Sequence, residues 1–184
     1  FADITTLAKG LGAGYQPIAA VMAAETIIAA IQEGSGMLWN GHTYMSHSIA
    51  TAGALAVQKV IEDEDLLENV KRCGDQLARE LSKQLGGREN IGDIRGRGLF
   101  WSIELVRDKI TKKPFPENLK LAQRIQINAK ELGLMCYPAQ GCADGKNGDH
   151  VLLAPAYNST INEIDFIAKT TAKAIWKSLS EVNC

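Results

Sequence analysis

Residues 3–21 of the chain read DITTLAKGLGAGYQPIAAV, with one lysine, Lys9, in the middle. Lys9 follows the apolar pair Leu7-Ala8 and precedes glycines at positions 10, 12 and 14, ahead of the apolar residues 17–22. A lone lysine is usually a solvated surface group. Its amine becomes a useful nucleophile when desolvation or a nearby cation lowers its pKa, and small neighbours let a flat aromatic cofactor approach the backbone. The stretch makes Lys9 a candidate nucleophile, with a surface lysine as the alternative.

The glycine spacing in this stretch argues against a nucleotide site. Gly10-x-Gly12-x-Gly14 is not the GxGxxG pattern of dinucleotide-binding proteins, and the GxxxxGK[ST] phosphate loop is absent from the chain.

Composition and charge limit the class of protein. The 184 residues are 46% hydrophobic and 22% charged, which is an ordinary globular balance, and the net charge is −1. No nucleic-acid partner is expected, because such surfaces show a basic excess. No membrane partner is expected either, since no apolar run approaches the roughly 20 residues that span a bilayer.

Cysteine and histidine usage predicts neither disulfides nor a metal site. The cysteines are widely spaced and form no CxxC pair, which favours reduced thiols in a cytoplasmic protein. The histidines are scattered and HExxH is absent, so no metal is expected. The cysteines are Cys73, Cys136, Cys142 and Cys184.

The first third of the chain predicts short elements followed by long helices. We expect a buried strand at 18–23, a helix at 25–32 ending at Gly34, and a loop at 35–45. A small-residue helix follows, capped by Ser46 or Ser48 and suited to packing on a sheet. Acidic residues 62–65 interrupt the helical pattern, and a second amphipathic helix then runs to Gly86-Gly87. We place a domain border between residues 62 and 63.

The later residues predict a small α+β domain. Residues 91–106 read as strand, with Leu99, Trp101, Ile103 and Leu105 on one face after the turn glycines Gly96 and Gly98. Pro116 is expected to open a helix that ends at Gly133, and short strands are expected at 134–137 and 150–154. Thr160-x-x-Glu163 is a capping-box pattern for the final helix.

Four segments in chain order resemble class III (omega-type) aminotransferases, which depend on pyridoxal 5'-phosphate (PLP). They are residues 3–21, residues 40–44 (NGHTY), residues 94–105 (IRGRGLFWSIEL) and residues 148–156 (GDHVLLAPA). The resemblance implies an α/β protein of PLP-dependent transferase fold type I. Residues 1–62 would end the large PLP-binding domain, and residues 63–184 would form the C-terminal small domain.

The resemblance also implies cofactor contacts. Lys9 would form the Schiff base with PLP and shuttle the proton between substrate carbon and cofactor. Thr43 would bind the cofactor phosphate from the neighbouring subunit, with His42 as a weaker neighbour, so a homodimer with shared active sites is implied. By itself, the loop around Thr43 also fits ordinary turn chemistry before a helix.

Two further residues are substrate candidates. Arg97 could bind a substrate carboxylate bidentately, and the alternative is a surface or domain-interface arginine. Tyr137 stands where many omega-type members carry a carboxylate-binding arginine. Ala156 replaces a second proline that is common in the family's "LAPP" strand. The departure at Tyr137 leaves the carboxylate partner open, and with it the amino donor and acceptor.

The implied reaction moves an amino group from an amine or amino acid to a 2-oxo acid. A decarboxylase, mutase or racemase with the same lysine is the alternative within the fold. A cofactor-free dimerisation or binding module is the alternative outside enzymes, and an unrelated α/β domain is a third.

The chain reads as a protein cut inside a domain, since Phe1-Ala2-Asp3-Ile4 has no initiator Met and no leader. An upstream portion would carry the aromatic residue that stacks on PLP and the acid that pairs with its ring nitrogen. The 184 residues by themselves are therefore not expected to form a competent active site, and a targeting signal would lie upstream.

Overall fold

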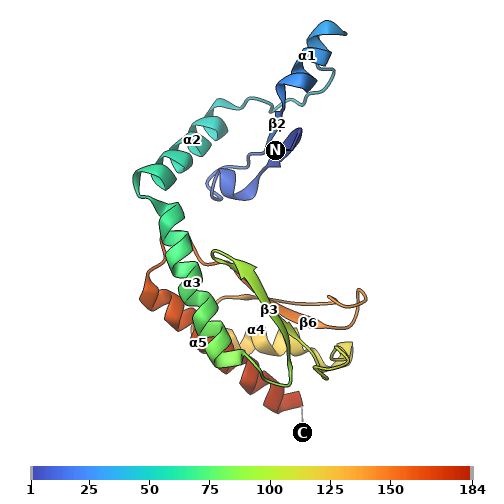
Figure 1. Ribbon diagram of the computed structural model, residues 1–184, viewed down its shortest axis with the longest axis vertical. Coiled ribbons are helices and arrows are strands. Elements are labelled where there is room, and N and C mark those ends of the chain that lie inside the picture. Colours follow the sequence, from blue (N-terminus) through green and yellow to red (C-terminus); the bar gives the residue numbers. More distant parts are fainter. Residues whose placement is uncertain (1, 183–184) are drawn as a thin grey trace. The chain divides into compact units, whose positions relative to one another are not determined.

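A computed structural model describes residues 2–182, which form two compact units that divide between Asp65 and Leu66 (Figure 1). Phe1 and Cys184, both singled out from the sequence, lie outside the described residues. The sequence placed a border between residues 62 and 63. The identity of these units as parts of a large and a small domain stays a prediction.

The first unit begins with a two-stranded hairpin. Strand β1 (Ile4–Leu7) pairs antiparallel with β2 (Ala20–Ala23), and the connection contains the 3-10 helix η1 (Lys9–Leu11). Helix α1 (Glu25–Glu33) follows and ends at Gly34, as predicted. The strand predicted at 18–23 is shorter in the structure, and the prediction that it is buried is wrong for this unit, because Val21 and Met22 are exposed.

The unit ends with helix α2 (Ser48–Asp63), whose cap differs from the prediction. Neither Ser46 nor Ser48 caps it. The N-cap is His47, whose Nδ1 accepts a hydrogen bond from the Ala50 N–H at 3.3 Å. An acceptor nitrogen on an imidazole can satisfy a free amide of the first turn as a serine oxygen would.

The second unit is a four-stranded antiparallel sheet with helices on one face (Figure 1). The strands are β3 (Ile91–Arg97), β4 (Phe100–Leu105), β5 (Tyr137–Gln140) and β6 (Asp149–Leu153), in the order β3-β4-β6-β5. The predicted strand region at 91–106 is a hairpin, and Gly98, one of the two turn glycines expected there, lies at its turn with φ 55°. The predicted strands at 134–137 and 150–154 lie at 137–140 and 149–153.

The helices of this unit are α3 (Leu66–Leu85), α4 (Leu121–Glu131) and α5 (Ile161–Val182). Pro116 does not open α4. It precedes the 3-10 helix η2 (Glu117–Leu119), and Lys120 then adopts a left-handed conformation (φ 51°) that separates η2 from α4. No helix among residues 2–182 is long and apolar enough to span a bilayer.

The predicted capping box of α5 is confirmed. Glu163 Oε2 accepts a hydrogen bond from the Thr160 N–H at 2.7 Å, and Thr160 Oγ1 accepts one from the Glu163 N–H at 3.3 Å. Both bonds lower the energy of free amides at the helix start. The Thr160 amide also holds the pKa of Glu163 below its usual value.

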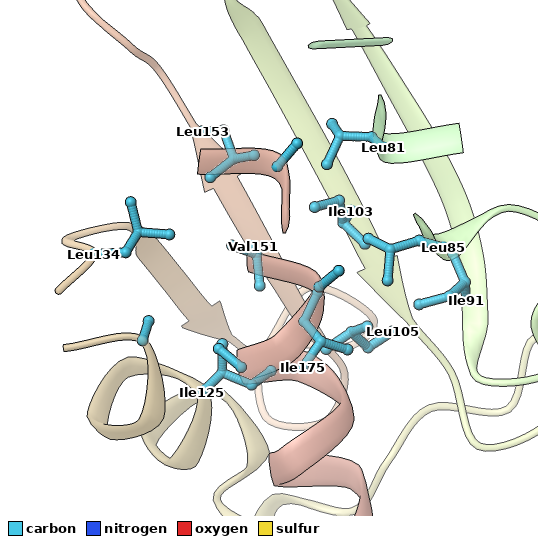
Figure 2. Close-up of a cluster of buried hydrophobic side chains, with 14 of the residues drawn as sticks. Leu81, Leu85, Ile91, Ile103, Leu105, Ile125, Leu134, Val151, Leu153 and Ile175 are labelled. Carbon is cyan, nitrogen blue, oxygen red and sulfur yellow. The ribbon is translucent and has the colours of Figure 1, made fainter. Parts of the chain in front are cut away.

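The core lies between the helices and one face of the sheet (Figure 2). Ile103 and Leu105 of β4 and Val151 and Leu153 of β6 point into it, as period-two alternation requires. The predicted one-face set is confirmed, with Leu99 buried and Trp101 half-buried. Apolar residues at helical spacing close the core from the other side, namely Leu77, Leu81, Leu85, Ile125, Ala129, Ile164, Ala168 and Ile175.

Helix α4 is capped from a distant strand. Its neighbour Lys120 offers no side-chain cap, and the Ala122 N–H instead donates to Asp149 Oδ1 at 2.9 Å. Asp149 is only 1% exposed, and burial raises the pKa of its carboxyl group despite this hydrogen bond. Its other oxygen, Oδ2, has no partner among the described residues.

Two replacements of Asp149 should distinguish the stabilising effect of its hydrogen bond to α4 from the cost of its buried charge. Asp149→Ala leaves the Ala122 N–H unpaired and should destabilise the fold by about 1 kcal/mol or more. Asp149→Asn keeps the acceptor oxygen without the buried charge and should be at least as stable as wild type at pH 7. Thermal unfolding midpoints of the full-length variants measure both.

The stability difference between Asp149→Asn and wild type should depend on pH. The carboxyl pKa is higher in the folded than in the unfolded chain, so the cost of the buried charge disappears as the pH falls through the folded-state pKa. The advantage of Asp149→Asn should therefore be largest near neutral pH and shrink in acid. An advantage that grows in acid would contradict the assignment.

Candidate functional site

Lys9 stands at a strained turn directly after strand β1. Ala8 is extended, and Lys9 then has φ 50°, in the left-handed region. Ala13, at the other end of the turn, has φ 47°. Each such residue costs roughly 1–2 kcal/mol when it is not glycine, and strained residues of this kind concentrate at functional sites. The Lys9 side chain is exposed in the unit.

The three glycines of the turn have different roles. A Cβ on Gly12 would lie 2.9 Å from Ile18 Cγ2 and 3.0 Å from the Gln16 carbonyl oxygen, so only glycine fits there. Gly14 has φ 80°, which again favours glycine. Gly10 has no atom within 4 Å of its missing Cβ. Gly12 and Gly14 therefore shape the turn, whereas Gly10 leaves free space beside Lys9.

Helix α2 anchors the lysine turn. Its buried residues are Ala50 and Ala54, and its Gln58 Nε2 donates a hydrogen bond to the Leu11 carbonyl at 3.2 Å. One turn earlier, a Cβ on Gly53 would lie 3.3 Å from Gln16 Cγ. The small residues of α2 therefore lie against the connection that carries Lys9, where the sequence predicted packing on a sheet.

His42 and Thr43 lie in the loop that leads into α2. The His42 carbonyl accepts a hydrogen bond from the Met45 N–H at 2.9 Å, which closes a turn around Thr43. Both side chains are exposed, and within residues 2–182 neither makes a hydrogen bond or ion pair. No such bond joins them to Lys9 in that range either, so the link between the two segments is α2 itself.

Arg97 ends β3 at a rigid turn. Gly74 of α3 approaches the Gly98 carbonyl so closely that no side chain would fit, and Trp101 Nε1 donates to the same carbonyl at 2.7 Å. Leu99 is buried in the core. Arg97 is exposed and makes no side-chain hydrogen bond or ion pair in the described part of the chain.

Arg95 lies two residues before Arg97 on the same face of β3, and its charge is already paired with two carboxylates. Its Nη1 lies 3.0 Å from both Asp93 Oδ2 and Glu104 Oε2. The hydrogen bonds that Arg95 donates to the carboxylates of Asp93 and Glu104 raise the pKa of Arg95 above its ordinary value. Of these two arginines, Arg97 alone is open to a carboxylate ligand among residues 2–182.

Tyr137 opens β5 and is 68% exposed. The register puts it on the same face of the sheet as Arg97, because cross-strand partners share a face. β3 and β5 are the two edge strands, so two strands lie between them and their backbones are about 14 Å apart at the usual strand spacing. The structure therefore brings Arg97 and Tyr137 onto one surface without direct contact.

Sequence reasoning missed the polar cluster on this face, formed by Asp93, Arg95, Glu104 and His150. His150 lies opposite Glu104 in the register, and its Nδ1 is buried with no partner among the described residues. Burial lowers the pKa of His150, Arg95 lowers it further, and Glu104 opposes both. The alternation of Asp93 and Arg95 along one strand could have indicated their shared face. No group of side chains in residues 2–182 is arranged to hold a metal.

Comparison with known proteins gives consistent matches along almost the whole chain. The family model for class-III aminotransferases matches residues 1–175. An aminotransferase of Gibberella zeae is 41% identical over 174 residues, which cover 94% of this chain and 34% of that protein. A transaminase structure from the marine bacterium Virgibacillus superposes with a TM-score of 0.90 at 33% identity, over 99% of this chain and 40% of that chain.

A second solved structure carries the cofactor. It is an amine transaminase from an uncultivated Pseudomonas species in its PLP-bound form, with a TM-score of 0.82 and 32% identity over 97% of this chain and 38% of that chain. The chain thus spans a third to two fifths of the length of the relatives it matches.

The glycine contacts predict a matched pair of variants. Gly12→Ala introduces a Cβ against Ile18 and the Gln16 carbonyl and should destabilise the cofactor-free full-length protein by about 1–3 kcal/mol. Gly10→Ala meets no atom within 4 Å and should be close to neutral. Chemical denaturation of both variants is the measurement, and equal effects would contradict the packing assigned to Gly12.

Proposed function

The chain belongs to the class III aminotransferase family, and from this premise we propose that the whole protein is a PLP-dependent aminotransferase that moves an amino group from an amine or amino acid to a 2-oxo acid. The expected fold class, α/β of PLP-dependent transferase fold type I, is confirmed by the transaminase structures that the chain matches. The activity is proposed for the whole protein, of which this chain spans a third to two fifths of the related length.

The strained turn at Lys9 is the observation that carries the proposal. We propose that Lys9 holds PLP covalently through its ε-amine. The turn fits such a group for three reasons. The Lys9 backbone is left-handed, Gly10 leaves free space beside it, and α2 holds the connection in place. When bound, PLP supplies an electron sink for the substrate carbon that bears the amine.

Lys9 has a second role in the proposal. Once the substrate amine has replaced it on the cofactor, the freed and neutral ε-amine would accept the proton from the reacting substrate carbon and return it during transfer. The hydrogen bond from Gln58 to the Leu11 carbonyl ties the backbone that carries Lys9 to α2, which supports the positioning that general acid–base catalysis requires. The exposed side chain needs the remaining part of the protein around it to exclude water.

The loop before α2 is the proposed phosphate site. Thr43 would donate its hydroxyl hydrogen bond to the cofactor phosphate, and His42 would lie beside it. Two observations support this role: both side chains are exposed, and the loop runs into the start of a long helix, where an anion is favoured. We propose that this loop serves the site of the partner in a homodimer, so that both active sites are shared.

We propose Arg97 as a substrate-carboxylate ligand, supported by its free guanidinium at a rigid turn. Tyr137 is proposed as a second substrate contact on the same face of the sheet. Residues 1–62 and 63–184 are proposed as the end of the large domain and the small domain. A cytoplasmic location is also proposed, and the free thiols of Cys73, Cys136 and Cys142 are compatible with a reducing compartment.

The cofactor assignment predicts a colour and a labelled residue. Full-length protein with PLP should absorb visible light, and borohydride should bleach the band and fix the cofactor on the peptide that contains Lys9. Lys9→Ala should abolish the band's sensitivity to borohydride and lower keto-acid-dependent turnover by at least about a hundredfold.

Lys59→Ala is the matched control, because Lys59 is an exposed lysine of α2 that pairs with Asp63. It should leave the band and turnover unchanged. A full-length protein that stays colourless after addition of PLP would refute cofactor binding. A coloured protein without keto-acid-dependent turnover would refute aminotransfer.

Shared active sites predict complementation between two defective variants. Thr43→Val should weaken PLP binding by about tenfold, and Thr43→Ser, which keeps the hydroxyl, should restore it. If Thr43 serves the partner's site, a Lys9→Ala/Thr43→Val heterodimer contains one intact site, and an equal mixture at limiting PLP should recover about a quarter of wild-type activity. No recovery after subunit exchange would place Thr43 in its own subunit's site.

A further inference from the structure

The free face of the second unit's sheet divides into a closed polar part and an open amphipathic part. Pairing in the register defines three rows across the strands. The first contains Asp93, Glu104, His150 and Ala139, the second contains Arg95, Ser102, Leu152 and Tyr137, and the third contains Arg97 and Phe100. All of these residues face away from the helices, because their neighbours along each strand point into the core.

The charges of the polar part are paired with one another. Arg95 is paired with both Asp93 and Glu104, so the charges of this cluster have partners within the cluster. An anionic ligand would have to displace two carboxylates from Arg95, which makes that guanidinium a poor binding site. The charge that remains available on this face is the one on Arg97.

The open part is a continuous diagonal strip formed by Arg97, Phe100, Leu152 and Tyr137. Arg97 and Phe100 are direct cross-strand partners, Leu152 is a diagonal neighbour of Phe100, and Tyr137 is the direct partner of Leu152. Phe100 is 62% exposed and Tyr137 is 68% exposed, while Leu152 is half-buried. The strip thus places one unpaired cation beside aromatic and aliphatic groups on the same face of the sheet.

We propose that this strip recognises the substrate, and that the substrate class is a carboxylate with a large apolar or aromatic side chain. The inference rests on the proposed aminotransferase function and names a substrate class for that reaction. The carboxylate of the amino acid or 2-oxo acid binds Arg97 bidentately. Its apolar side chain lies over Phe100 and Leu152 and extends toward the Tyr137 ring.

The dimensions favour a large side chain. The strip crosses three strand spacings, about 14 Å in all. Pyruvate would occupy the Arg97 end alone, whereas an aromatic 2-oxo acid such as phenylpyruvate reaches the apolar part. The contribution of Phe100 should therefore depend on the side chain of the ligand, while that of Arg97 should depend on its carboxylate.

Binding to the full-length protein tests this without turnover. The probe is 3-phenylpropanoate, an unreactive carboxylate with an aromatic group, measured by calorimetry. Arg97→Gln should weaken its binding by about tenfold or more, because a charge-assisted bidentate contact is lost. Phe100→Ala should weaken it by about tenfold through lost apolar burial. Arg79→Gln is the matched control, since Arg79 is an exposed arginine of α3 that bonds only Gln76 among the described residues.

Turnover of the holoenzyme gives the second readout. Phe100→Ala should lower kcat/KM for phenylpyruvate by about tenfold and for pyruvate by less than about threefold. Arg97→Gln should lower both, with the loss mainly in KM. General damage to the fold would not separate the two oxo acids in this way.

The results distinguish failure of the strip as a substrate site from failure of the proposed aminotransferase function. Arg97→Gln and Phe100→Ala proteins that bind 3-phenylpropanoate and turn over phenylpyruvate like Arg79→Gln would overturn the strip as a substrate site while leaving aminotransfer intact. Wild-type protein that binds PLP but turns over neither oxo acid would overturn the proposed function, and with it the assignment of the strip to substrate, whatever 3-phenylpropanoate binds.

Discussion

The strained backbone at Lys9 is the constraint on which the candidate chemistry depends. A left-handed lysine is unfavourable in an isolated peptide, and it persists because its surroundings admit few alternatives. Gly12 lies against Ile18 and the Gln16 carbonyl, which sets the width of the turn. The hydrogen bond from Gln58 to the Leu11 carbonyl ties that turn to α2. The lysine amine is therefore carried by a supported turn and not by a free loop.

Helix α2 supports both the lysine turn and the loop that contains His42 and Thr43. Its middle holds the lysine turn through small residues, and its first turn, capped by His47, receives the loop of His42 and Thr43. One helix thus connects the turn that carries Lys9 to the loop that carries the proposed phosphate ligands, Thr43 and His42. Its exposed apolar side chains, among them Ile49, Leu55 and Val60, fit a helix that is covered in the whole protein.

In the second unit, one face of the sheet builds the core and the other carries the residues proposed to bind substrate. The covered face supplies the core. Of the helices that cover it, α5 is capped by the Thr160–Glu163 box and α4 by the carboxylate of Asp149. The free face carries charge and exposed aromatic rings, with the Arg95 cluster neutralised and Arg97 open. Because the alternation of a strand assigns adjacent residues to opposite faces, the same strands build both.

Local pattern by itself determined several features of this protein. Residues a few positions apart, whose geometry backbone chemistry fixes, indicated four of these features. They are the nucleophile candidate Lys9, the helix expected at 25–32 before Gly34, the capping box at Thr160 and the apolar face of β4. Tertiary structure alone decided the rest. Asp149 caps α4 from 27 residues away, and the strands take the order β3-β4-β6-β5. Arg97 and Tyr137 therefore lie on one face with two strands between them. Strand order and register follow from packing of the whole unit, which no short stretch of sequence contains.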